Sequence, residues 1–149
     1  MKRDVGVYIS DILKSIKLIK LYSKEKSLKE FSRSIKEQDA ITRRIEIIGE
    51  AIKSIPEEFK KKYPHINFKG FEKTRDFLSH VYFGVNVERL YLMIEKDLPI
   101  LEKELLKIFL KNPEKLLSKF YIQEKLWGDY MNIDKNRNLR SNIQNLRKS

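Results

Sequence analysis

The sequence predicts an all-α fold, an antiparallel up-down helical bundle, from three observations. Apolar residues recur every three or four positions over most of the chain, which is the spacing of one face of an α-helix. Only 5 Gly and 4 Pro occur among 149 residues, which is typical of a helical chain rather than a loop-rich one. No strand-like alternation, internal repeat or Gly-rich phosphate loop is evident.

The first two helices follow from an apolar stripe and a capping signal. Val5, Ile9, Ile12, Ile16 and Ile19 share one face and predict a helix over residues 4–22. The sequence Ser27-Leu28-Lys29-Glu30 matches a capping box and predicts the start of a second, long helix. We expect that helix to stop at Pro56, because proline lacks the backbone N–H and disfavours helix at the residue before it.

Two more helices are predicted after a break at residues 56–70, which contains Pro56 and Pro64. The third covers about residues 71–82, with Gly84 as its end signal. Asn86 caps a fourth helix whose apolar seam continues to Ile108, and Pro99 is expected to bend it.

Three segments of different character divide the chain. Residues 1–112 are predicted to form the bundle, and residues 113–131 an additional amphipathic helix. Residues 132–149 are rich in Asn and basic residues, and we interpret them as a basic, flexible tail, disordered or folding upon a partner.

Composition restricts the chemistry. The net charge of +11 is typical of a protein that contacts a polyanion, although 21 acidic residues are mixed among 32 basic ones. Without cysteine there is no disulfide or thiolate metal site, and no cluster has metal-ligand spacing, so we expect neither a metal nor another cofactor. No apolar run has the length of a signal peptide or membrane span, so we expect a soluble, cytoplasmic protein that does not contact the membrane.

The candidate site is the segment from Arg75 to Tyr82. On a regular helix Arg75 and Tyr82 lie within about 20° of one face, whereas His80 lies roughly 140° around and about 7.5 Å along the axis from Arg75. These residue types suit phosphodiester cleavage without a metal. His80 can move the proton of a ribose 2′-hydroxyl, and Arg75 can bind the charged phosphoryl oxygens. Asp76 can orient Arg75, and Tyr82 can stack on a base or donate to a phosphate.

Structural roles compete with this interpretation. A lone histidine on a helix is more often structural, and an arginine beside an aspartate more often forms a surface salt bridge. The second histidine, His65, lies in a proline-containing loop and is interpreted as a solvated surface residue. From the residue types alone, a catalytic role and a structural role both remain open for Arg75 and His80.

Over about residues 5–110 the chain resembles the HepT-like branch of the HEPN family, whose members are encoded beside a minimal nucleotidyltransferase in toxin–antitoxin pairs. The pattern agrees in order and spacing, which is more specific than any single motif. It comprises Asp39, Arg43-Arg44, Glu46, Ile48-Gly49-Glu50-Ala51, Pro56, Pro64, Arg75-Asp76, His80-Val81-Tyr82-Phe83-Gly84-Val85 and Asp97-Leu98-Pro99.

The resemblance implies a HEPN-like bundle and a metal-independent endoribonuclease toxin that forms a homodimer around a shared cleft. It assigns Arg75 and His80 to catalysis and Asp76 and Tyr82 to supporting positions. It also implies that a partner nucleotidyltransferase, the antitoxin, attaches AMP to Tyr82 and thereby silences RNA cleavage. Two positions depart from the pattern, since Asp76 stands where asparagine is commoner and Phe68 where tryptophan is commoner.

A second function, of a different class, is a nucleotide- or nucleic-acid-binding helical subunit of a nucleotidyltransferase complex that has no catalytic turnover. Both functions predict a basic cleft, so the sequence does not separate them.

Overall fold

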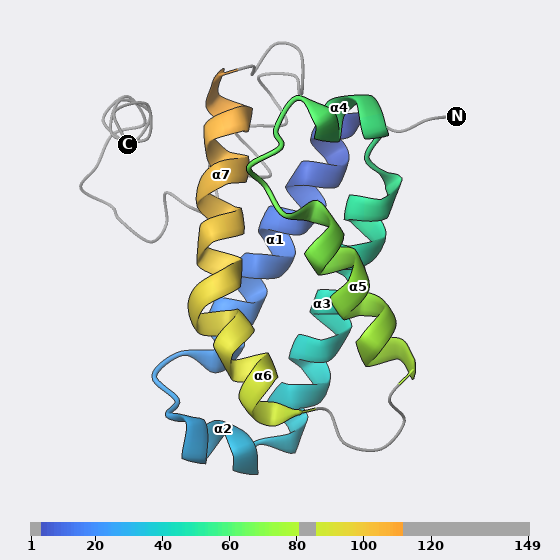
Figure 1. Cartoon of the computed structure of the whole chain (residues 1–149). Helices are drawn as coiled ribbons and strands as arrows, with labels where there is room; N and C mark the ends of the chain where they lie inside the picture. Colours follow the sequence, from blue (N-terminus) through green and yellow to red (C-terminus); the bar gives the residue numbers. More distant parts are fainter. Residues whose placement is uncertain (1–3, 81–85, 112–149) are drawn as a thin grey trace, which may run out of the picture.

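The helices of the chain form an antiparallel up-down bundle, as predicted (Figure 1). The computed structural model describes residues 4–80 and 86–111, and of residues 75–80 it describes the backbone alone. Figure 1 shows α1 and α5 running in one direction and α3 and the α6–α7 arm running in the other. No β-strand occurs within these two ranges. In chain order the elements are α1 (Val5–Ser23), α2 (Leu28–Arg33), α3 (Ile35–Ser54), α4 (Glu57–Lys61), α5 (Phe68–His80), α6 (Val87–Leu92), the π-helical turn η1 (Met93–Asp97) and α7 (Leu98–Lys111).

The core is built around α1, which packs against α3 and α7. The isoleucines of the predicted stripe of α1 are fully buried, whereas Val5 at its start is partly buried. The stripe meets a second isoleucine stripe on α3. Leucines of α7 complete the core on the other side. The fully or almost fully buried members are Ile9, Ile12, Leu13, Ile16 and Ile19 of α1, Ile41, Ile45, Ile48 and Ile52 of α3, and Leu98, Leu101 and Leu105 of α7.

Both predicted helix starts in the first thirty residues are confirmed by their hydrogen bonds. The Asp4 carboxylate accepts from the backbone N–H of Gly6 at 2.8 Å and caps α1. The backbone N–H of Glu30 donates to Ser27 Oγ at 3.2 Å, and that hydroxyl donates to Glu30 Oε1 at 3.2 Å. Ser27 and Glu30 thus engage each other, as a capping box requires.

The single long helix expected from Ser27 to Pro56 is wrong, because the chain breaks at Ser34. The Ser34 hydroxyl donates to the carbonyl of Glu30 at 3.0 Å, and the Gln38 amide donates to the carbonyl of Phe31 at 2.8 Å. Short polar side chains that bond the backbone offer it an alternative to continuous helix. The chain therefore turns after α2, and α3 begins anew at Ile35.

Polar contacts tie this turn and α1 to the rest of the bundle. Lys26 Nζ lies 3.3 Å from Glu37 Oε1. The pKa of the Glu37 carboxyl is lowered, first by a hydrogen bond from its own backbone N–H and then by Lys26. The Tyr91 hydroxyl donates to the carbonyl of Lys26 at 3.2 Å. Lys20 of α1 forms an ion pair with the buried Glu102 of α7. These contacts join the loop after α1 to α3 and α6, and α1 to α7.

The predicted helix over 113–131 and the predicted tail over 132–149 lie outside the described residues. Among the helices that are described, none is both long and apolar enough to cross a membrane.

The isoleucines of α3 give a test of the core. Ile48 is 1% exposed and Ile35 is 69% exposed. We expect Ile48→Ala to lower the free energy of unfolding by about 2–5 kcal/mol, because it removes buried methyl groups and leaves a cavity. Ile35→Ala, the matched control on the same helix, should change it by less than about 0.5 kcal/mol. Urea denaturation followed by circular dichroism measures both, and equal losses would contradict the assignment of the core face.

Candidate functional site

The helix that carries the predicted motif, α5, begins at Phe68, three residues earlier than expected. Asn67 precedes it, and its Oδ1 accepts from the backbone N–H of Gly70 at 3.0 Å, the bond of an N-cap. Phe68 is buried, and the buried Thr74 donates its hydroxyl to the carbonyl of Gly70 at 2.8 Å. The sequence placed Asn67 in a loop, and the capping signal three residues before Gly70 was missed.

Arg75, Asp76 and His80 all lie within α5, in the stretch where the sequence placed them on a helix. Arg75 directly follows Thr74, which faces the bundle, and α5 packs along α3. The structure thus gives the helical spacing of the motif but not the directions of these three side chains. Tyr82, the fourth predicted site residue, lies outside the described residues.

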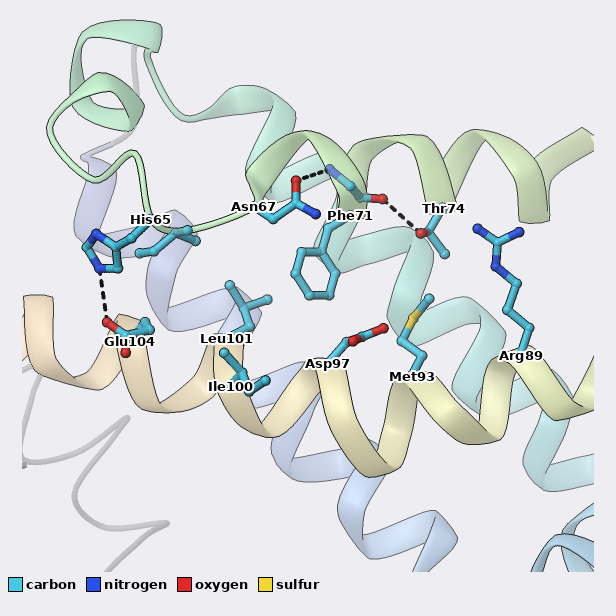
Figure 2. Close-up of a pocket in the computed structure, with 12 residues that line it drawn as sticks. His65, Asn67, Phe71, Thr74, Arg89, Met93, Asp97, Ile100, Leu101 and Glu104 are labelled. Atoms are coloured by element: carbon cyan, nitrogen blue, oxygen red, sulfur yellow. Dashed lines mark hydrogen bonds and ion pairs between the residues drawn. The ribbon is translucent and has the colours of Figure 1, made fainter.

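A hollow of about 350 Å³ lies between the first two turns of α5 and the arm formed by α6, η1 and α7 (Figure 2). Small-molecule sites occupy about 300–1,000 Å³, so this volume suits a small ligand. The hollow reaches Thr74, the residue before Arg75, and therefore adjoins the predicted motif. Its lining is His65, Ile66, Asn67, Gly70, Phe71, Thr74, Arg89, Met93, Asp97, Ile100, Leu101 and Glu104.

Charged groups of both signs surround this pocket. At one end His65 Nε2 lies 3.1 Å from Glu104 Oε2, so the exposed histidine expected to be merely solvated is held by an acid of α7. At the other end Arg89 extends from α6 toward α5, and Asp97 lies between the two ends (Figure 2). We did not predict Arg89 as a site residue. The spacing Arg89–Met93–Asp97, four residues each time, was the signal that could have found it.

The wall of the pocket contains an irregular turn. The backbone N–H of Leu98 donates to the carbonyl of Met93, five residues earlier, and this defines η1. Pro99 follows immediately; it has no N–H to donate and its ring crowds the preceding turn, which explains the widening. The sequence predicted a bend at Pro99, and the structure shows a π-helical turn directly before it. Such turns are rare and occur frequently at functional sites.

Among the side chains that the structure describes, those of residues 4–74 and 86–111, no group of three or more His, Asp or Glu residues is arranged to hold a metal ion. The pocket offers hydrogen-bond donors and acceptors instead.

Comparison with known proteins agrees with the resemblance. The family described as Ribonuclease HepT-like matches residues 12–108, which include α5 and the whole pocket. The "Probable ribonuclease HepT" of Thermococcus cleftensis is 40% identical over 102 residues, 68% of this chain and 93% of that protein. A protein of Methanocaldococcus jannaschii named "Gamma-glutamylcyclotransferase and putative RNase" is 49% identical over 108 residues, 72% of this chain.

The chain spans about half the length of that archaeal relative, since the match covers 49% of it. No solved structure matches the chain significantly. The family match extends over more than half of the chain and coincides with the described bundle. The chain therefore belongs to the HepT-like ribonuclease family, a family of RNA-cleaving enzymes.

Proposed function

We propose that this protein is a metal-independent endoribonuclease in which Arg75 and His80 act on one RNA phosphodiester. The observation that carries the proposal is the match of residues 12–108 to HepT-like ribonucleases, within which α5 holds Arg75 and His80 on one helix. The net charge of +11 supports an RNA substrate, because basic proteins attract polyanions by releasing their counterions.

The proposed reaction is an internal transfer at phosphorus. His80 removes the proton of the ribose 2′-hydroxyl, and the 2′-oxygen then forms a bond to the adjacent phosphorus. The bond from phosphorus to the 5′-oxygen of the next nucleotide breaks, and that oxygen takes up a proton. Arg75 stabilises the charge that develops on the phosphoryl oxygens. The products are a 2′,3′-cyclic phosphate and a 5′-hydroxyl, and Asp76 supports the site by orienting Arg75.

We also propose that the protein is the toxin of a toxin–antitoxin pair, in the form of a homodimer with two motifs in a common cleft. Its partner, a minimal nucleotidyltransferase, transfers AMP from ATP to the Tyr82 hydroxyl and releases pyrophosphate. The attached phosphate repels an RNA phosphate and competes for Arg75, so inhibition needs no change of fold. The alternative is a binding subunit without turnover, which has the same cleft and cuts nothing.

The catalytic assignment predicts that His80→Ala abolishes RNA cleavage and that Arg75→Ala lowers it about a hundredfold or more, because a transition-state donor is lost. Arg33→Ala, on the exposed end of α2, is the matched control and should cleave like the parent. Cleavage of labelled RNA in the presence of EDTA measures all four proteins, with circular dichroism to verify folding. Undiminished cleavage by folded His80→Ala would overturn the mechanism, and no cleavage by the parent would favour the binding subunit.

The dimer is tested by mass in solution. Light scattering of the full chain at micromolar concentration should give about twice the 17.9 kDa chain mass. A symmetric pair is the commonest assembly of soluble homo-oligomers and brings identical motifs to one axis. A single species of one chain mass, unchanged on concentration, would remove the shared cleft.

Control at Tyr82 is tested by intact-protein mass after incubation with ATP, Mg²⁺ and the partner nucleotidyltransferase. The parent should gain one or more AMP units and lose RNA cleavage. Tyr82→Phe should gain none and keep cleaving, because it lacks the acceptor oxygen. Undiminished modification of the Phe variant would place the acceptor on another residue.

A further inference from the structure

The pocket beside the motif has an apolar wall and a polar rim, the composition expected of a site for a flat heterocycle. The Phe71 ring points into the hollow, and the buried Met93 and Leu101 lie on the opposite side (Figure 2). Aromatic rings in nucleic-acid-binding proteins stack on bases regardless of their sequence. Sulfur atoms of methionine also contact aromatic rings favourably. The wall therefore suits a base held between Phe71 and Met93.

The rim supplies an acceptor, the Asp97 carboxylate. It is the last residue of η1 and is exposed, and its oxygens are directed into the pocket (Figure 2). In the part of the chain that the structure describes, neither an ion pair nor a hydrogen bond engages it. An ionised carboxylate has two oxygens and can only accept hydrogen bonds. A ligand that satisfies both oxygens must present two neighbouring N–H donors.

The rim also supplies a donor, the Asn67 side-chain amide. Its Oδ1 is occupied by the backbone N–H of Gly70, so its Nδ2 group is the end that faces the pocket (Figure 2). Gly70 leaves room for this arrangement, because a Cβ at that position would lie 2.4 Å from Asn67 Nδ2. Asn67 therefore caps α5 with one end and offers two amide donors with the other.

We propose that this pocket binds a guanine base of the RNA strand, and this proposal rests on the ribonuclease function proposed above. The Watson–Crick edge of guanine carries N1–H and N2–H side by side, which match the two oxygens of Asp97. The adjoining O6 is an acceptor and matches Asn67 Nδ2. No other RNA base has two neighbouring donors on this edge.

The same groups reject the other bases. Uracil has one N–H between two carbonyl oxygens, and these oxygens would face the carboxylate. Adenine and cytosine have one amino group beside a ring nitrogen, and the lone pair of that nitrogen would repel the Asp97 carboxylate. Unpaired or repelled polar groups are an effective source of discrimination.

The position of the pocket also orients the strand. Arg89 lies at the end nearest Thr74 and places a positive charge there, which attracts a phosphate (Figure 2). The pocket reaches Thr74, and Arg75 is the next residue of α5, so a nucleotide held in the pocket lies beside the proposed motif. We therefore place the guanine next to the cleaved bond.

The first experiment measures binding apart from cleavage. Guanosine 5′-monophosphate and uridine 5′-monophosphate are titrated calorimetrically into the full chain carrying His80→Ala. Adding Asp97→Asn should weaken guanosine monophosphate binding about tenfold to a hundredfold, since a bidentate base contact is lost. Adding Glu95→Gln, an exposed acid of the same turn that does not line the pocket, should leave binding unchanged.

Asn67→Asp keeps the helix cap but loses the two amide donors, so it should weaken guanosine monophosphate binding as well. Equal affinities for the two nucleotides in the parent would overturn the proposal.

The second experiment uses RNA oligonucleotides that differ only in one base beside the cleaved bond. The parent should prefer guanine about tenfold or more, Asp97→Asn should abolish this preference, and Glu95→Gln should keep it. Cleavage without any base preference, or a preference that Asp97→Asn leaves intact, would refute the guanine site. If the parent cuts no RNA but still binds guanosine monophosphate through Asp97, the ribonuclease function fails and the placement in an RNA strand fails with it. These results separate the two proposals.

Discussion

Burial of the isoleucine stripe of α1 is the constraint on which the rest of the fold depends. Ile9, Ile12, Ile16 and Ile19 are 0% exposed, and they are covered from two sides by α3 and by the η1–α7 arm. A helix buried along this much of its length cannot shift without exposing several apolar side chains to water. α5 packs along α3 instead, and it faces η1 and α7 across the pocket (Figure 2). The core therefore leaves a hollow beside the helix that carries the motif.

The irregular turn η1 connects the core to that hollow. Met93, Ile94 and Leu98 are buried, whereas Asp97 between them is exposed. In a regular helix the backbone N–H at position 99 would donate to the carbonyl four residues earlier. Pro99 has no N–H and cannot make this bond. The π-helical turn resolves the conflict, because Leu98 donates to Met93 and the following residues can rejoin the core as α7. Asp97, on the pocket rim, is the last residue of this turn and lies two residues before Pro99.

The sequence predicted the helices because their signals are local. The apolar period located α1 to within a residue, and Pro56 marked the end of α3 to within two residues. Ser27 with Glu30 marked a helix start that the hydrogen bonds confirm. The break at Ser34 was missed, because it depends on which carbonyls the Ser34 and Gln38 side chains reach. The candidate motif followed from residue type and family pattern. The pocket did not, since Asn67 and Asp97 line one pocket only because helices far apart in the sequence pack together.

The net positive charge of the chain and the negative charge of Asp97 have opposite effects on RNA binding. The chain carries +11, and basic residues spread over it attract any RNA with little regard to sequence. An exposed acid beside the proposed motif works against this attraction, because the Asp97 carboxylate repels the phosphates of an RNA backbone. Unlike Glu104, which lies 3.1 Å from His65, Asp97 has no partner within the described residues to offset that repulsion. Its position is therefore unfavourable for general RNA affinity and favourable only for a ligand that brings its own N–H donors. The proposed guanine site would thus gain specificity at the expense of general affinity, as sites that discriminate by repulsion do.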